Sequence, residues 1–336
     1  MRWGVATVLI LGGTAWLGAQ IAGQCAAAGD QVTCLARGSV WAAPPAVTFL
    51  AVDRTRPDAY QGVADRDWDR VVDVSWQPGQ VASAVEALGH HARHWTYVSS
   101  CSVYADHATP GADETAARHA PLLTDEATMA DYAGAKVRCE DLVTSALGTR
   151  ALLVRAGLIA GPGDPSDRFG YWVGRFALAG SGAVLIPDEP RQWTQAIDVR
   201  DLAAWIVAAG SQGAAGAVNA VGQPTDLGAV LAGAARIAEF AGTLVPVESS
   251  WLRERGVEPW AGPRSLPLWL PDPDYAGFGA RDGRRAKELG LTRRDLDQTL
   301  RDTLIDERAR GLGRDRRAGL TRHEELALLE AWAAGR

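Results

Sequence analysis

The sequence predicts an α/β protein with a doubly wound parallel sheet and a smaller C-terminal lobe. Short apolar runs rich in β-branched residues alternate with segments of helical periodicity through the first half of the chain. Such alternation is typical of a parallel sheet that carries helices on both faces. After residue 161 the alternation weakens, and Pro, Gly, Trp and Arg become frequent. We interpret this second part as a lobe built around a ligand.

The expected elements follow from these runs. Strands are predicted at residues 5–11, 31–35, 47–51, 70–74, 95–99 and 151–155, and helices at residues 19–28, 80–90 and about 127–147. We expect residues 1–160 to form the first domain and residues 161–336 the lobe. Residues 195–222 should return to the first domain as a helix and a strand. Capping-box patterns at residues 292–295 and 321–324 predict two further helix starts.

A glycine-rich turn lies between the first predicted strand and the first predicted helix. This order predicts a dinucleotide-binding site, in which the pyrophosphate lies at the N-terminus of the helix. Gly12 allows a tight turn, and Gly18 allows the helix to pack closely. The predicted pyrophosphate site consists of Gly12, Thr14, Ala15, Trp16, Leu17 and Gly18. An ordinary turn between a strand and a helix is the alternative.

The end of the second predicted strand indicates which dinucleotide binds. An acidic residue there would bind the ribose 2′-hydroxyl of NAD, whereas this chain has Ala36 followed by Arg37. A guanidinium can bind the 2′-phosphate of NADP through charge-assisted hydrogen bonds. We therefore predict NADP. NAD is the alternative if Arg37 is only a solvated loop residue.

Tyr132 and Lys136 are four residues apart in a predicted helix, so their side chains share one face. A free tyrosine has a pKa of about 10, and a nearby ammonium group favours the phenolate. Ser100, directly after the fifth predicted strand, can hold a carbonyl oxygen beside the phenol. Together the three residues predict a site that transfers a hydride and a proton. A half-buried tyrosine and a solvated lysine on an ordinary helix are the alternative.

With these motifs assembled, the chain resembles the extended short-chain dehydrogenase/reductase superfamily, which contains NAD-dependent epimerases and dehydratases. The resemblance is carried by the glycine turn, by the three residues above, and by residues 53–54, 98–104, 155–163 and 195–202. It implies that Ser100 is the catalytic serine, that Tyr132 is the acid/base, and that Lys136 is its partner and contacts the nicotinamide ribose. Asp53 would contact adenine. Further expected cofactor contacts are Arg54, Val74, Ser75, Gly157 and Leu158.

Departures from the family pattern favour a reductase. Ala15 replaces the usual central glycine of the turn, as in atypical members, some of which are not enzymes. Cys101 and Ser102 stand where sugar-nucleotide dehydratases have an Asp-Glu pair, and Leu158 stands where nucleotide-sugar enzymes have an asparagine. Epimerases and dehydratases of this family typically retain NAD, whereas NADP(H) suits a reductase that exchanges its cofactor in each turnover.

Aromatic residues in the lobe could form the wall of a pocket for a cyclic or largely apolar substrate. Packing within the lobe core is the alternative. These residues are Tyr171, Trp172, Trp193, Trp260 and Trp269. Arg264 could bind a substrate anion or local carbonyl groups. The residues predicted to contact the substrate are Trp76, Cys101, Ser102, Trp172, Gln195 and Arg264.

Composition argues against several other classes of protein. A net charge of −6 is unlike that of a nucleic-acid-binding surface, and no apolar run approaches the roughly 20 residues of a membrane span. The four cysteines and six histidines show no metal-ligand spacing. The sequence has no Gly-x-Ser-x-Gly motif of the kind that would indicate a hydrolase. We expect no metal and a cytoplasmic protein with reduced cysteines. The resemblance also implies a homodimer.

The leading functional hypothesis is an NADP(H)-dependent oxidoreductase that reduces a ketone, or oxidises a secondary alcohol, of a small and partly apolar metabolite. An epimerase of a sugar-like substrate is the first alternative, because it would return the same hydride to the opposite face. A non-enzymatic NADP-binding sensor is the second. The complete set of Ser100, Tyr132 and Lys136 argues against the sensor, which has no need of a phenolate.

Overall fold

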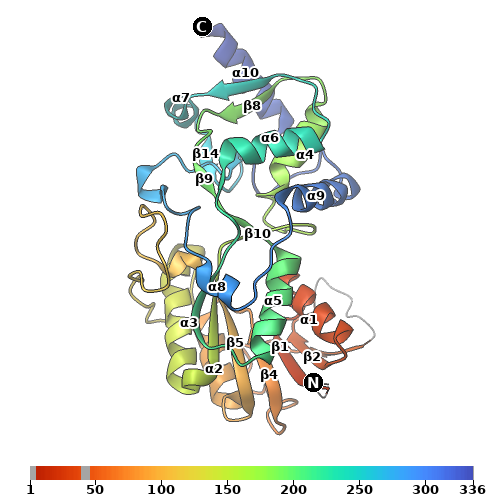
Figure 1. The fold of residues 1–336 in the computed structure, drawn as a ribbon, viewed down its shortest axis with the longest axis vertical. Coiled ribbons are helices and arrows are strands. Elements are labelled where there is room, and N and C mark those ends of the chain that lie inside the picture. Colours follow the sequence, from red (N-terminus) through yellow and green to blue (C-terminus); the bar gives the residue numbers. More distant parts are fainter. Residues whose placement is uncertain (1–4, 39–45, 336) are drawn as a thin grey trace.

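A seven-stranded parallel sheet organises the first part of the chain in the computed structural model, which describes residues 5–38 and 46–335 (Figure 1). The strand order is β11-β6-β5-β4-β1-β2-β3. The strands are β1 (Thr7–Leu11), β2 (Gln31–Ala36), β3 (Val47–Ala51), β4 (Trp68–Asp73), β5 (Ala92–Ser100), β6 (Ala151–Ala156) and β11 (Gly216–Ala220). Every pair in this sheet is parallel. The predicted doubly wound sheet is confirmed.

Helices cover both faces of the sheet because its strands are apolar on both sides. Helices α1 (Trp16–Ala27) and α5 (Val199–Ser211) pack together on one face. Helices α2 (Pro78–Leu88) and α3 (Tyr132–Leu147) pack on the other (Figure 1). The strand order reverses between β1 and β4, so the ligand crevice of such a fold is expected beyond the carboxyl ends of these two strands.

The lobe above the sheet has its own apolar core (Figure 1). Helices α4 (Gly170–Ala179), α6 (Leu227–Ile237) and α9 (Leu296–Arg310) pack on one another there. Its short strands are β7 (Leu158–Ala160), β8 (Val184–Pro187), β9 (Trp193–Thr194), β10 (Ala196–Asp198), β12 (Thr225–Asp226), β13 (Leu244–Val247), β14 (Glu258–Trp260) and β15 (Ser265–Pro267). The remaining helices are α7 (Ser249–Glu254), α8 (Arg284–Glu288) and α10 (Arg322–Ala334). No helix within the described ranges is long and apolar enough to span a membrane.

Capping chemistry explains where the helices depart from the prediction. Helix α3 starts at Tyr132 rather than near residue 127, because Thr128 and Asp131 form a capping box around a short 3₁₀ turn. The expected box at residues 321–324 is present at the start of α10. The one at residues 292–295 is not, since α9 begins only after Asp295. Helix α8 contacts β11, a return to the first part that the sequence did not indicate.

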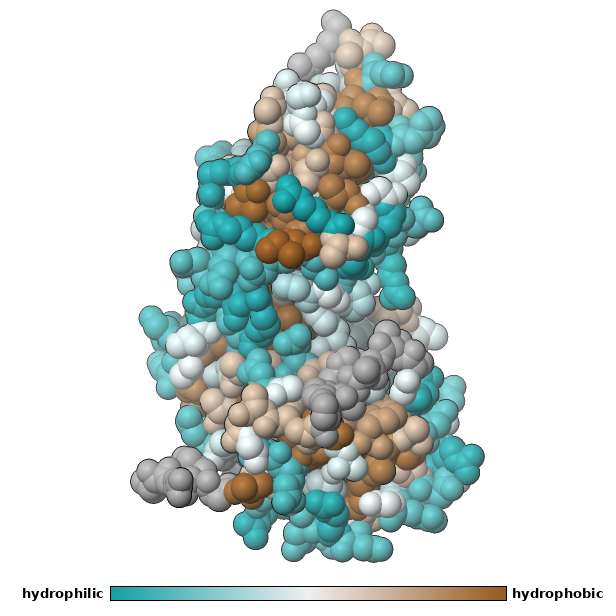
Figure 2. All heavy atoms as spheres, turned by 90° about the vertical axis from the view of Figure 1, so that its right-hand side faces the viewer, coloured by the Kyte–Doolittle hydropathy of each residue, from teal (hydrophilic) through white to brown (hydrophobic). Residues whose placement is uncertain are grey.

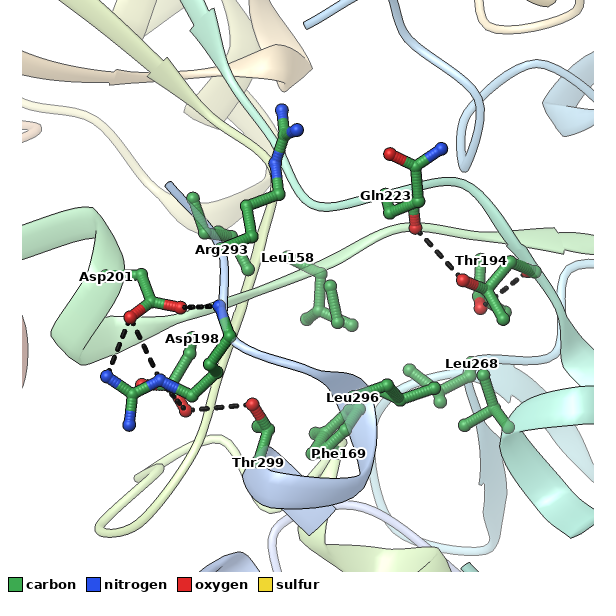
Figure 3. A pocket seen from close by; sticks show the side chains of 15 residues that line it. Leu158, Phe169, Thr194, Asp198, Asp201, Gln223, Leu268, Arg293, Leu296 and Thr299 are labelled. Carbon is green, nitrogen blue, oxygen red and sulfur yellow. Dashed lines mark hydrogen bonds and ion pairs between the residues drawn. The ribbon is translucent and has the colours of Figure 1, made fainter. Parts of the chain in front are cut away.

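Polar contacts join α5 to the lobe. Asp198 accepts a hydrogen bond from the Arg200 amide at the start of α5 and another from the Thr299 hydroxyl of α9, at 3.0 Å. Asp201, one turn further along α5, accepts hydrogen bonds from the backbone and guanidinium of Arg294. Figure 3 shows Asp198, Asp201 and Thr299 at the edge of a cavity of about 60 Å³. Hydrophilic side chains are also prominent where the two parts meet in Figure 2.

A buried carboxylate fixes α3 to the sheet. Glu140 of α3 is fully buried and accepts hydrogen bonds from Ser99 Oγ on β5, at 2.6 Å, and from Arg155 Nε and Nη2 on β6, at 2.9 and 2.8 Å. Arg118 adds a contact from the more exposed side, at 3.1 Å. Since Glu140 lies on the same helical face as Tyr132 and Lys136, this ion pair sets the position of that face relative to β5.

We expect Glu140→Gln to lower the free energy of unfolding by about 3–5 kcal/mol, because it leaves the guanidinium of Arg155 buried without a counter-charge. Urea unfolding followed by circular dichroism measures this change. Arg118→Gln is the matched control, since the Arg118 side chain is 34% exposed and Glu140 keeps Arg155 in that variant. It should cost at most about 1 kcal/mol. Equal losses in the two variants would contradict the role given to the buried pair.

Candidate active site

The glycine turn at the end of β1 forms a cradle at the start of α1. Gly12 has a φ of +89° and donates its amide to the Leu35 carbonyl. A Cβ on Gly18 would lie 2.4 Å from the Gly12 carbonyl oxygen, so only glycine allows this approach. Ala15 caps the helix in an extended conformation, with φ −71° and ψ 155°, and contributes no side-chain cap. An L-residue adopts this conformation without strain, which explains why alanine can replace glycine there.

Trp16 fastens the lobe to this cradle. Its indole Nε1 donates a hydrogen bond to the Pro162 carbonyl at 2.9 Å. The segment that follows β7 is therefore held against the first turn of α1, where the free amides of a helix N-terminus favour an anion. The sequence indicated a backbone role for Trp16 but not this contact.

A pocket of about 540 Å³ lies beside the turn, beyond the ends of β2, β3 and β4. Arg37 lies in its lining, and no carboxylate within the described residues forms an ion pair with its guanidinium. Asp53 accepts hydrogen bonds from the amide and hydroxyl of Thr55, which hold the pKa of its carboxyl below the usual range. The other predicted cofactor residues in this lining are Gly12, Thr14, Ala15, Arg54, Val74 and Ser75.

Arg54 has a structural role that the sequence did not indicate. Its guanidinium makes a bidentate ion pair with Asp73 at the end of β4, with both distances 2.9 Å. It also donates to the Tyr60 hydroxyl and the Gln80 carbonyl. These partners engage all three guanidinium nitrogens of Arg54. The arginine therefore forms part of the pocket lining, but its charge is not free for a cofactor.

The three predicted catalytic side chains lie in one larger cleft of about 730 Å³ between the sheet and the lobe. Ser100 ends β5, and its Oγ accepts a hydrogen bond from the Ser102 amide at 3.1 Å. Tyr132 begins α3, with its ring 5.6 Å from the ring of Trp76. Lys136 is buried, with its Nζ 5.9 Å from the centre of the Tyr132 ring. The helical spacing of four therefore produces the convergence that the sequence indicated.

Lys136 is held in place by backbone carbonyls rather than by a carboxylate. Its Nζ donates to the oxygens of Ser75 and Val98, at 3.0 and 2.7 Å, beyond the ends of β4 and within β5. An ammonium has three protons, so these contacts leave one donor for a ligand. The ammonium also lies 4.8 Å from the centre of the Tyr97 ring.

The cleft joins the predicted cofactor and substrate residues. It is lined from the sheet side by Ala15, Trp16, Leu17, Val74, Trp76, Ser100, Cys101, Ser102 and Gly157, and Leu158 of β7 lines it from the lobe. Its lining also includes residues that the sequence did not single out for the site, namely Met129, just before α3, and Asp164, Ser166, Arg168, Phe278 and Arg317 from the lobe. Trp260, one of the aromatic candidates, lies among them. No group of three or more His, Cys, Asp or Glu side chains in the described part of the chain could hold a metal ion.

Three of the predicted substrate residues are not in the lining of this cleft. Trp172 is fully buried in the lobe core, where its indole donates to the Pro267 carbonyl. Gln195 is buried, and its side-chain amide donates hydrogen bonds to the carbonyls of Gly222 and Arg281. Arg264 donates to the Arg255 carbonyl and contacts Glu324. Each is engaged by the protein itself, the alternative that the sequence had left open for Trp172 and Arg264.

Comparison with solved structures shows the same fold in several proteins. A putative epimerase from Burkholderia cenocepacia J2315 has 22% sequence identity and a TM-score of 0.69, over 92% of this chain and 100% of that one. The UDP-glucose 4-epimerase of Thermus thermophilus, solved with NAD, has 16% identity and a TM-score of 0.64, over 90% and 99%. The UDP-glucuronic acid 4-epimerase of Bacillus cereus, also solved with NAD, has 13% identity and a TM-score of 0.64, over 90% and 99%.

Comparison with curated proteins finds no match. The model of the NAD dependent epimerase/dehydratase family matches residues 8–222, which include the glycine turn, Ser100, Tyr132 and Lys136. This match covers more than half of the chain. The protein therefore belongs to the NAD-dependent epimerase/dehydratase family.

Proposed function

We propose that the protein is an NADP(H)-dependent oxidoreductase that interconverts a ketone and a secondary alcohol. The observation that carries this proposal is the convergence of Ser100, Tyr132 and Lys136 in a cleft that opens onto the glycine turn. A cofactor with its pyrophosphate at the start of α1 would extend from the pocket at Arg37 toward Tyr132. When bound, NADP(H) would supply or accept the hydride.

Ser100, Tyr132 and Lys136 would carry out the steps other than hydride transfer. The Ser100 hydroxyl would hold the carbonyl oxygen, and the Tyr132 hydroxyl would donate the proton as the alcohol forms. The ammonium of Lys136, fixed by the carbonyls of Ser75 and Val98, would favour the phenolate when the reaction runs toward the ketone. Because the two carbonyls fix Nζ, its third proton remains available for a ribose hydroxyl or the phenol.

The preference for NADP over NAD rests on Arg37. The similar epimerases of known structure were solved with NAD, and an acidic residue at the end of β2 would suit that cofactor. Here Ala36 ends β2, and Arg37 follows in the lining of the pocket. A 2′-phosphate near Arg37 would meet a cation and no carboxylate from β2.

An epimerase is the second candidate, favoured by the family match and by the structural neighbours. One lining residue supports the reductase instead, because Leu158 offers no hydrogen bond to a nucleotide-sugar phosphate. Cys101 argues against a dehydratase, since burial raises the pKa of its thiol to about 12 and it cannot replace a carboxylic acid. Retention of cofactor through purification would favour the epimerase, and free exchange the reductase.

The assembly and location of the protein are also proposals. We propose a homodimer, as in many enzymes of the superfamily, and a reducing, cytoplasmic setting. All four cysteines are buried and unbridged, which fits that setting. Sedimentation equilibrium measures the oligomeric state directly.

Tyr132→Phe should lower turnover by about 10²–10⁴-fold, because the variant keeps the ring but lacks the hydroxyl that carries the proton. The measurement is NADPH consumption on a substrate found by screening ketones. NADPH affinity and thermal stability should stay close to wild type. Tyr275→Phe is the matched control, because Tyr275 lies outside the lining of the cleft and is 41% exposed. Near-normal turnover by Tyr132→Phe would disprove the proposed chemistry.

Arg37→Ala should remove most of a preference for NADPH over NADH. A hydrogen bond to a charged group contributes about 1.5–3 kcal/mol, so the ratio of the two dissociation constants should fall by at least about tenfold. Fluorescence titration with each cofactor measures both constants. Arg56→Ala serves as the control, since Arg56 is a nearby exposed arginine paired with Asp58. Equal affinity of the wild type for NADPH and NADH would refute the assignment.

A further inference from the structure

Two arginines on the lobe side of the cleft have no ion-pair partner. Arg168 and Arg317 both line the cleft. Among residues 5–38 and 46–335, no carboxylate lies within ion-pairing distance of either guanidinium. Other arginines nearby, such as Arg310 and Arg314, are paired with acids. The cleft therefore presents two guanidinium groups that form no ion pair with a described residue.

Arg168 is held rigidly although its charge is unpaired. Its Nε donates to Ser166 Oγ at 3.1 Å, and its guanidinium carbon lies 4.9 Å from the centre of the Trp260 ring. Trp260 itself has a φ of +69°, an uncommon conformation for a bulky residue, and packs edge-on against Phe278. One edge and one face of the guanidinium are thus occupied. Its two terminal nitrogens make no hydrogen bond to any described residue.

The acids that could pair with Arg168 are already engaged. Both oxygens of Asp164 accept hydrogen bonds from Ser166. The carboxylate of Asp167 accepts hydrogen bonds from the guanidinium groups of Arg310 and Arg314 and from the Arg317 amide. Asp164 lines the same cleft and interacts electrostatically with Arg168, but it forms no ion pair with the guanidinium, so the terminal nitrogens keep their hydrogen-bonding capacity for a ligand anion.

The segment that carries Arg168 is fastened at three points. Trp16 binds the Pro162 carbonyl, Asp306 accepts the Gly163 amide, and Arg310 donates to the Asp164 carbonyl. A guanidinium held in this way loses little further freedom when it binds an anion, which favours affinity. Burial lowers the pKa of Arg168, and the nearby Asp164 and Tyr132 act in the opposite direction.

We infer that the substrate carries a carboxylate that Arg168 binds, with Arg317 adding charge at the rim. This inference rests on the proposed function, because it places the carbonyl group of the same molecule at Ser100 and Tyr132. The aromatic side chains of Trp76, Trp260 and Phe278 line the space between and suit an apolar body. The substrate class is therefore an aromatic or alicyclic keto acid, or the corresponding hydroxy acid. A single guanidinium with two free nitrogens matches the two oxygens of a carboxylate.

A binding experiment tests this inference separately from turnover. With NADP⁺ bound, the protein is titrated with 3-phenylpropanoate and with its neutral isostere, 3-phenylpropanamide, following tryptophan fluorescence. We expect the carboxylate to bind about 10- to 100-fold more tightly. Arg168→Gln should abolish that preference, and Arg168→Lys should retain part of it. Arg253→Gln, which removes an exposed arginine on α7, should leave it unchanged.

The controls separate this inference from the proposed function. Tyr132→Phe should keep the preference for the carboxylate even though turnover is lost, because it does not remove the guanidinium. Equal binding of acid and amide by the wild type would overturn the inference, as would a preference that survives Arg168→Gln. If Arg168→Gln weakened NADPH binding as much as carboxylate binding, Arg168 would serve the cofactor pyrophosphate instead. Tighter binding of 2-phenylethyl phosphate than of the carboxylate would also overturn it.

Discussion

The position of the proposed catalytic helix depends on one buried ion pair. Glu140 and Arg155 join α3 to β6, and the Ser99 hydroxyl adds β5 to the same cluster. Lys136 of the same helix adds hydrogen bonds to the Ser75 and Val98 carbonyls, so directed polar contacts as well as apolar packing hold α3 on the sheet. Tyr132, Lys136 and Glu140 are spaced by four and share one face of α3, so contacts that fix Glu140 also fix the side of the helix that carries Tyr132. A residue two turns away from Tyr132 thus helps to hold the proposed catalytic face of α3 on the sheet.

A second set of contacts fixes the crevice at which the strand order reverses. Arg54 pairs with Asp73 at the end of β4, and Lys136 reaches the carbonyl of Ser75 just beyond it. Both cations stabilise the backbone where β4 leaves the sheet. Lys136 therefore has two roles, one in holding this backbone and one proposed in the chemistry at Tyr132. A substitution at Lys136 would disturb both, which makes it a poorer probe of mechanism than Tyr132.

The sequence predicted the first part of the chain well because the signals there are local. Strand runs, the turn at Gly12 and the helical spacing from Tyr132 to Lys136 each lie within a few neighbouring residues, and the fold then brings the motifs together. The lobe gave no such signal. Trp172 and Trp260 look equivalent in the sequence, yet one is in the core and the other lines the cleft. Arg264 and Arg168 differ likewise. Arg264 donates hydrogen bonds to the Arg255 carbonyl, whereas among the described residues the Arg168 guanidinium is bonded only through its Nε, to Ser166, and the sequence does not show which arginine has partners.

The two ends of the cleft differ in how closely they follow the family. At the cofactor end, even the replacement of a glycine by Ala15 keeps the turn, since that position is extended and needs no glycine conformation. At the lobe end, Leu158 has no polar group for a nucleotide phosphate, while Arg168 lies unpaired against Trp260. The positive charge of Arg168 thus lies close to Tyr132. A short substrate with its anion near the reacting carbon would fit this placement, because the terminal nitrogens of Arg168 could then bind the anion directly.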